Sequence, residues 1–165
     1  MKLLPPLAAA PDALAEPPPV RAIYPGFTGS RKGMTQEQMA SFRSLMKQFQ
    51  PQGFRHGDCV GADADAHGIM LELGMESDRI WLFPSDIVAM RAFCCGLVAT
   101  RPQSPLMRNR LIVDHSDVLI ATPDTSYERQ RSGTWATVRY AKQSHRVVIV
   151  IAPCGTMQMH KPSHD

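Results

Sequence analysis

Apolar residues along the chain form short continuous runs and stretches of helical spacing, and the two patterns alternate between positions 20 and 153. The clearest helical stretch consists of Met39, Phe42, Leu45, Met46 and Phe49. Because these residues recur three or four positions apart, they predict the apolar face of a helix. We expect this helix to begin after Thr35, since Gln38 stands three residues further on and completes the pattern of a capping box.

The same two patterns predict the remaining elements. We expect further helices at about 63–73, 105–112 and 132–143, and strands at 20–27, 54–57, 79–83, 117–121 and 146–152. Ser104 followed by Pro105 is a typical helix start, with the proline at the first helical position. The stretch 85–103 fits two interpretations, a short helix at about 87–97 or an insertion near the functional site.

The order of these elements favours one fold class. The uninterrupted apolar run at 147–151 predicts a strand buried on both faces, as in a parallel sheet with helices on either side. Five strands that alternate with helices predict a Rossmann-like, doubly wound α/β domain, with a mainly parallel five-stranded sheet and helices on both faces. In such sheets ligands bind beyond the carboxyl ends of the strands, where the connections change direction. The loops that follow the strands are therefore the candidate binding segments.

Both ends of the chain differ in composition from the middle. Residues 1–19 are rich in proline and alanine, which predicts a flexible arm. The alternative is a signal peptide, but Pro5 and Pro6 interrupt the apolar stretch earlier than such a segment tolerates. Residues 154–165 show no periodicity and are expected to form a flexible tail, so that the folded domain spans 20–153.

Composition narrows the class of protein. A chain of 165 residues, 44% of them hydrophobic, is enough for one domain with one core. The net charge of +3 and the isoelectric point near 8.8 suit an anionic small ligand better than a duplex-binding surface. No apolar run approaches the roughly 18 residues of a membrane span, so we expect no membrane partner. The four cysteines form no CxxC pair, which favours reduced thiols in a cytoplasmic protein.

The first candidate loop follows the strand predicted at 20–27. It contains Thr28, Gly29, Ser30 and Arg31. Glycine allows a close approach of the backbone to an anion, hydroxyl groups donate hydrogen bonds, and arginine adds a planar charged group. The glycine spacing matches neither the dinucleotide GxGxxG pattern nor a Walker loop, and no bound cofactor is expected. A tight turn without a ligand is the alternative interpretation.

The second candidate loop leaves the strand predicted at 54–57 and opens the following helix. It consists of His56, Gly57, Asp58, Cys59, Val60, Gly61, Ala62 and Asp63. Free N–H groups at a helix start attract anions, and the glycines keep the approach open. We expect Asp58 to accept hydrogen bonds from ribose hydroxyls and Asp63 to cap the helix. A metal site at His56, Asp58, Asp63 and His67 is an alternative, but the spacing fits no standard zinc pattern and no metal is expected.

The third candidate loop precedes the last predicted helix and consists of Arg131, Ser132, Gly133 and Thr134. The helix that starts at position 105 adds Arg108, Asn109 and Arg110. Positions 108 and 110 cannot share a helix face, so one arginine is expected at the site. Arg108 lies with Leu111 and Ile112 near the apolar side of its helix, while Arg110 is expected to pair with Asp114, and either arginine is a candidate for the site. A solvated charged face is the alternative.

Taken in order, these segments resemble the superfamily that unites Rossmann-like proteins of the DprA, LOG and YpsA types, often called SLOG. The similarity is greatest to its small stand-alone domains related to YspA. The segments that carry it are Thr28 to Arg31, His56 to Asp63 with Ala66 and His67, Arg108 to Arg110, Asp117 to Pro123, and Arg131 to Trp135. The resemblance spans about 20–152, and the ordered combination of these short motifs is fairly specific.

The resemblance implies a pocket for a nucleotide or nucleotide derivative, with Pro123 among its residues. Some members of the superfamily are phosphoribohydrolases, which cleave the base from a nucleoside monophosphate and carry their catalytic glutamate in a PGGxGTxxE segment. Gly133 and Thr134 match this segment, but Thr137 occupies the glutamate position. Binding or sensing of a nucleotide-derived molecule is therefore the first interpretation, and nucleotide N-glycosidase activity the second. The candidates for a substitute catalytic carboxylate are Asp58, Asp124 and Glu128.

Two further expectations concern macromolecular partners. Binding of single-stranded nucleic acid is the third interpretation and is not favoured, because the 7% of aromatic residues are not arranged as a stacking platform in a basic groove. Members of the superfamily commonly pair through helices, so the resemblance implies a homodimer with Met39, Met46 and Met70 as candidate contact residues. The alternative is that these methionines fill the core of the monomer.

Overall fold

The computed structural model describes residues 23–163, so the arm predicted at 1–19 lies outside the described residues. Within this range the helices are α1 (Gln36–Phe49), α2 (Ala62–Glu72), α3 (Pro105–Asp114) and α4 (Gly133–Gln143). The strands are β1 (Pro25–Gly29), β2 (Phe54–His56), β3 (Ile80–Leu82), β4 (Leu97–Val98), β5 (Val118–Thr122), β6 (Val147–Ile151) and β7 (Met157–His160). Short 3-10 helices cover Ser77–Arg79 and Val88–Met90. No helix in the described range is long and apolar enough to cross a membrane.

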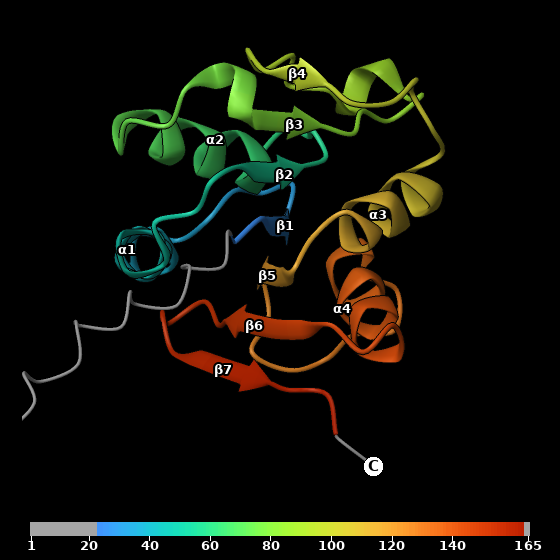
Figure 1. Ribbon diagram of the computed structural model, residues 1–165. Coiled ribbons are helices and arrows are strands. Elements are labelled where there is room, and N and C mark those ends of the chain that lie inside the picture. Colours follow the sequence, from blue (N-terminus) through green and yellow to red (C-terminus); the bar gives the residue numbers. More distant parts are fainter. Residues whose placement is uncertain (1–22, 164–165) are drawn as a thin grey trace, which may run out of the picture.

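The strands form a seven-stranded sheet in the order β4-β3-β2-β1-β5-β6-β7, and of the described strands only β7 runs antiparallel to its neighbour (Figure 1). Helices α1 and α2 cover one face and α3 and α4 the other, which confirms the predicted Rossmann-like α/β fold. From β1 the chain builds outward to β4 and then crosses to β5 on the other side of β1. The winding therefore reverses between β1 and β5, and their carboxyl ends flank the place where such sheets bind ligands.

The sequence predicts five strands, and the structure adds two. β4 lies in the stretch 85–103, which contains only a 3-10 turn at Val88–Met90 instead of a longer helix. β7 lies in the predicted flexible tail, so that expectation is wrong for Met157–His160. Backbone hydrogen bonds to β6 hold this edge strand, and most of its side chains are exposed, so no apolar periodicity marks it in the sequence.

Apolar side chains fill the space between the sheet and each pair of helices. On the face covered by α1 and α2, three phenylalanines contact one another with ring centroids 5.4, 5.8 and 6.0 Å apart. Met46 and Met70 are each 2% exposed and belong to this layer, and Met39 packs against it. Met46 and Met70 fill the core, so the expectation that they form a contact surface between two copies is wrong for these two residues, whereas Met39 is half-buried.

One buried polar side chain ties α1 to the sheet. The predicted capping box is present, because the Thr35 hydroxyl accepts from the N–H of Gln38 and the Gln38 Oε1 accepts from the N–H of Thr35, both at 3.0 Å. The Nε2 group of Gln38 also donates to the carbonyl oxygens of Pro123 at 2.8 Å and Ile151 at 2.9 Å. The same amide thus starts α1 and fixes it to the ends of β5 and β6.

Replacing this amide tests its contribution. Gln38→Ala is expected to lower the free energy of unfolding by about 3 kcal/mol, because two buried carbonyl oxygens lose their donor and the capping box is broken. Urea denaturation at neutral pH measures the change. Gln36→Ala, an exposed position in the same helical turn, is the matched control and should change stability by less than about 0.5 kcal/mol. Equal effects of the two substitutions would contradict the assigned role.

Candidate functional site

A cavity of about 690 Å³ lies at the carboxyl ends of β1 and β5, where the winding of the sheet reverses. We refer to it as the carboxyl-edge pocket. Its walls come from the loop after β1, the start of α2, the first turns of α3 and the start of α4. The predicted site residues that line it are Thr28, Gly29, Ser30, Arg31, Asp63, Arg108, Asn109, Ser132, Gly133 and Thr134. The structure therefore brings parts of all three candidate loops together with α3 around one cavity.

Other predicted site residues do not line the pocket. They are His56, Gly57, Asp58, Gly61, Ala62, Arg110 and Pro123. The guanidinium of Arg110 lies over the ring of Tyr140, 5.3 Å from its centroid. Its expected pairing with Asp114 is wrong, because the Asp114 carboxylate accepts a hydrogen bond from the Tyr140 hydroxyl at 2.9 Å. One arginine of α3 thus reaches the pocket, as the helical spacing predicts.

The pocket also has lining residues that sequence reasoning does not select as ligand contacts. They are Phe27, Lys32, Cys59, Val60, Met90, Pro105, Ile112, Asp124, Arg129 and Arg131. Arg131 belongs to the third candidate loop and Lys32 directly follows the first, so the sequence carries a signal for these two cations, whereas Arg129 lies outside the three loops. Met90 carries no such signal, because it comes from the stretch 85–103 and reaches the pocket only through tertiary contacts.

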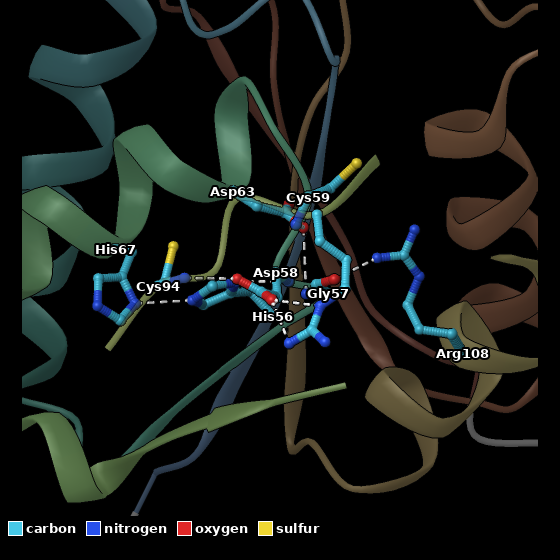
Figure 2. A network of polar contacts seen from close by, with 9 residues as sticks. His56, Gly57, Asp58, Cys59, Asp63, His67, Cys94 and Arg108 are labelled. Carbon is cyan, nitrogen blue, oxygen red and sulfur yellow. Dashed lines mark hydrogen bonds and ion pairs between the residues drawn. The ribbon is translucent and has the colours of Figure 1, made fainter. Parts of the chain in front are cut away.

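Two buried charged side chains hold the turn after β2, residues 56–60 (Figure 2). The Asp63 Oδ2 atom accepts hydrogen bonds from the backbone N–H groups of Gly57 and Cys59, both at 3.1 Å. Arg108 reaches across from α3 and donates from a terminal nitrogen to the Gly57 carbonyl at 2.6 Å. A side chain at Gly57 would collide with this guanidinium, so the approach requires glycine. Asp63 therefore secures the turn before α2. The expectation that it caps the helix is wrong, because no side chain caps the start of α2.

Arg108 carries a positive charge in the pocket wall that forms no close ion pair, although the buried Asp63 carboxylate lies near enough to compensate part of it. The residue is 5% exposed, and it forms no ion pair with any residue of the range 23–163. Its Nε atom is buried and lacks a hydrogen-bond partner there. A buried guanidinium is strongly stabilised by a carboxylate or phosphate that accepts its hydrogen bonds. The pocket therefore offers an anion a buried guanidinium that has more donors than the one bound to the Gly57 carbonyl.

Asp58 has a different place from the one expected, because its carboxylate does not line the pocket. The residue is completely buried, and its backbone lies in the left-handed region with φ of 53°. The carboxylate accepts hydrogen bonds from the guanidinium of Arg91 at 3.0 Å and from the N–H of Cys94 at 2.8 Å. Asp58 thus fastens the stretch 85–103 to the turn after β2, and this contact positions Met90 in the pocket wall.

Two buried histidines form a directed hydrogen-bond chain beside the same turn (Figure 2). The N–H of Asp58 points at the Nδ1 atom of His56 at 3.0 Å, so this nitrogen carries a lone pair. The neutral ring then holds its proton on Nε2, which donates to Nδ1 of His67 at 2.9 Å.

The two rings also lie near the Cys94 thiol. Their nearest nitrogens and the Cys94 sulfur lie within 4.8 Å of one another, which is close enough for three ligands of one metal ion. The hydrogen bond between the rings uses the lone pair of His67 that faces this space, so a cation would have to displace the proton there. The arrangement fits a hydrogen-bonded pair better than a metal centre.

Burial shifts the pKa values around the turn in opposite directions. It lowers the pKa of His56 to about 3, with the nearby His67 and Arg108 adding to the effect, so His56 is neutral at physiological pH. It raises the pKa of Asp63 to about 6, although Arg108 opposes the shift. It also raises the pKa of the Cys94 thiol to about 12, with the Asp58 carboxylate contributing. Asp63 is thus a pocket residue whose charge changes near neutral pH.

The start of α4 presents backbone donors to the pocket. Ser132 caps this helix by accepting a hydrogen bond from the N–H of Trp135 at 3.3 Å. Gly133 and Thr134 follow as the first helical residues, so their N–H groups have no acceptor within the helix, and both residues line the pocket. The start of α2 differs, because the N–H of its first residue already donates to the Ser30 carbonyl at 2.9 Å. The start of α4 therefore offers free donors to an anion.

The acidic candidates for catalysis are engaged with cations. Asp124 lines the pocket, but its carboxylate lies 3.2 Å from the Lys32 ammonium and 3.6 Å from the Arg129 guanidinium. Glu128 pairs with an arginine of α4 at 3.0 Å. Thr137, at the position of the catalytic glutamate in the hydrolase motif, is buried and donates its hydroxyl hydrogen to a carbonyl of its own helix at 2.8 Å.

The raised pKa of Asp63 predicts a pH-dependent stability. A carboxyl whose pKa rises on folding stabilises the protein at pH values below its ordinary pKa of 3.8, and this contribution is lost as the pH rises through about 6. Asp63→Asn keeps an oxygen acceptor and removes the charge. Relative to this variant, the free energy of unfolding of the unaltered protein is expected to fall by about 2 kcal/mol between pH 4 and pH 7. Urea denaturation at several pH values measures it, and parallel profiles would contradict the expectation.

The contacts of Asp58 predict a local effect. Asp58→Asn suits the left-handed backbone but weakens the charged hydrogen bond to Arg91. Amide hydrogen exchange in the stretch 85–103 is therefore expected to accelerate by about tenfold, with little change in α1. Asp86→Asn, an exposed carboxylate in the same stretch, serves as the control and should leave exchange unchanged. Faster exchange throughout the protein would show a general loss of stability and contradict the local role.

Comparison with known proteins places the fold. No family model matches the chain, and no curated protein matches its sequence. A solved structure of the molybdenum cofactor binding protein from the phototrophic bacterium Rippkaea orientalis superimposes with a TM-score of 0.62 and 18% identity, over 80% of this chain and 77% of that one. The structural genomics target TM1055 superimposes with a TM-score of 0.54 and 16% identity, over 76% of this chain and 72% of that one. At these identities the likeness shows a shared α/β fold.

Proposed function

We propose that this protein binds a phosphate-bearing, nucleotide-derived small molecule in the carboxyl-edge pocket, and that it is a distant member of the SLOG superfamily. The observation that carries the proposal is the buried guanidinium of Arg108, which has no ion-pair partner among residues 23–163. The cations of the pocket lining are Arg31, Lys32, Arg108, Arg129 and Arg131, and its carboxylates are Asp63 and Asp124. This excess of positive charge favours an anionic ligand.

The phosphate group is assigned to the space between Arg108 and the start of α4. The backbone N–H groups of Gly133 and Thr134 supply neutral donors, and the positive end of the helix dipole adds to the attraction. The hydroxyl groups of Thr28 and Ser30, at the end of β1, line the same pocket. Charged and neutral donors from three elements are thus available to one anionic group.

The remainder of the ligand would contact the apolar part of the lining. Val60 and Met90 contribute this surface, with the buried side chains of Phe27 and Ile112 behind it, and the cavity of about 690 Å³ is within the range of small-molecule sites. A flat base or a comparable ring system fits such a surface, as the resemblance to nucleotide-binding proteins implies. The similar fold of a molybdenum cofactor binding protein supports small-molecule binding more broadly, and its ligand is a further candidate to be tested.

The engaged carboxylates favour binding over cleavage. Breaking an N-glycosidic bond develops positive charge on the ribose, which a nearby carboxylate stabilises. Asp58 and Glu128 lie outside the pocket lining, and Asp124 is paired with cations, while Thr137 offers a hydroxyl that is already bonded to its own helix. The second candidate function, a nucleotide N-glycosidase, would therefore depend on Asp63, whose pKa near 6 would let it exchange a proton at neutral pH.

Binding experiments with matched arginine variants test the proposal. Mass spectrometry of small molecules that copurify with the protein, with a molybdenum assay, identifies the ligand class. In calorimetry with nucleoside monophosphates, Arg108→Gln is expected to weaken binding by about 30-fold, because it removes a buried charge-assisted hydrogen bond. Arg131→Gln, at an exposed lining position, is expected to weaken binding by about threefold. Arg101→Gln, exposed and outside the lining, is the control and should have no effect.

Two results would contradict the proposal. Nucleosides that bind as tightly as their monophosphates would show that the pocket does not recognise phosphate. Rapid, saturable release of base from a nucleoside monophosphate, abolished in Asp63→Asn, would establish the glycosidase instead of a binding protein. Denaturation of each variant accompanies the titrations, because loss of the Arg108 contact to Gly57 also affects the fold.

A further inference from the structure

A second concave surface lies at the opposite edge of the sheet from the carboxyl-edge pocket. It is a cleft of about 380 Å³ between the end of α4, the start of β6 and the end of β7, elements that lie together in Figure 1. Its basic lining residues are Lys142, His145, Arg146, His160 and Lys161. The other lining residues are Pro162 and Ser163, so no carboxylate of the described chain lines this surface. We call it the basic cleft.

The positive charges of the basic cleft are not neutralised by neighbouring side chains. Lys142, Arg146 and Lys161 form no ion pair with any residue between 23 and 163. The Nε atom of Arg146 is buried without a partner, and a terminal nitrogen reaches only the backbone carbonyl of Asp114, at 3.4 Å. The nearby Asp114 carboxylate is engaged by a tyrosine hydroxyl at 2.9 Å. Three cations without an ion pair therefore line one cleft, and the nearby Asp114 carboxylate, which keeps its charge when it accepts from a neutral hydroxyl, offsets them only in part.

The end of α4 accounts for part of this clustering. Cations near the last turn of a helix interact favourably with its dipole, which explains Lys142 and the residues that follow the helix. His160 ends β7 and Lys161 follows it, and neither has such a reason to lie there. Basic groups from two separate elements thus face the same cleft, and the dipole stabilises only one set of them.

We propose that the basic cleft is a second anion site, which binds a small phosphorylated molecule through its phosphate or diphosphate group. Three full positive charges match an oxyanion with two or more negative charges, whereas a single carboxylate would leave most of the repulsion in place. The volume of about 380 Å³ suits one such group with a small organic part. This inference does not depend on the carboxyl-edge pocket, since the two sites share no residue.

Titration with inorganic pyrophosphate tests the second site directly. Calorimetry measures the affinity, and amide shifts in nuclear magnetic resonance spectra locate it. The largest shifts are expected at 144–147 and 160–161, in addition to any at 132–134 in the carboxyl-edge pocket. The double substitution Lys142→Gln and Lys161→Gln is expected to weaken pyrophosphate binding at the cleft by about tenfold or more, since two charged contacts are lost. Arg108→Gln should leave the shifts at 144–147 unchanged.

A control of equal charge makes the test decisive. The double substitution Lys47→Gln and Arg101→Gln removes two exposed cations elsewhere and should change pyrophosphate binding at the cleft by less than about twofold. An equal loss of pyrophosphate affinity in both double variants would show that net charge alone causes the effect, and this result would overturn the proposal. Shifts confined to the carboxyl-edge pocket, or no saturable binding at the cleft, would do the same. Affinity that grows steadily with the length of single-stranded RNA would assign the surface to nucleic acid instead of a small molecule.

Discussion

Two buried side chains of opposite charge, Asp63 and Arg108, hold one turn of the backbone by binding its N–H groups and one of its carbonyl oxygens. Asp63 binds the N–H groups of the turn after β2, and Arg108 binds its Gly57 carbonyl. Loss of either partner would leave a buried polar group unsatisfied and a buried charge with less compensation. Because α2 carries one of these residues and α3 the other, the turn also sets the distance between the two helices that flank the pocket.

The same turn determines the electrostatic character of the pocket. Asp63 is a negatively charged group of the pocket that loses its charge just below neutral pH, since burial raises its pKa to about 6. When it is protonated, the full charge of Arg108 is available to an anionic ligand; when it is ionised, it compensates part of that charge. Binding of the proposed anionic ligand and protonation of Asp63 would therefore favour each other.

Local sequence patterns predict most of the elements but only part of the site. The capping box of Thr35 and Gln38 and the helix start at Pro105 depend on residues within a few positions, so they are visible in the sequence. Asp58 is different, because its partners stand 33 and 36 residues further along the chain. From the sequence alone its carboxylate looks available to a ribose, and only the tertiary structure shows that it is already bound. β7 also depends on a long-range contact, its backbone pairing with β6.

β7 has a consequence for the behaviour of the whole sheet. β6 consists of five consecutive β-branched residues, valines and isoleucines, and β7 occupies the edge that it would otherwise present. An unpaired edge strand of this composition is a template on which strands of other molecules add and grow into fibrils. At the other end of the sheet β4 is only two residues long, which limits the same danger there. A chain shortened at residue 153 would thus become prone to aggregation while retaining every residue that lines the carboxyl-edge pocket.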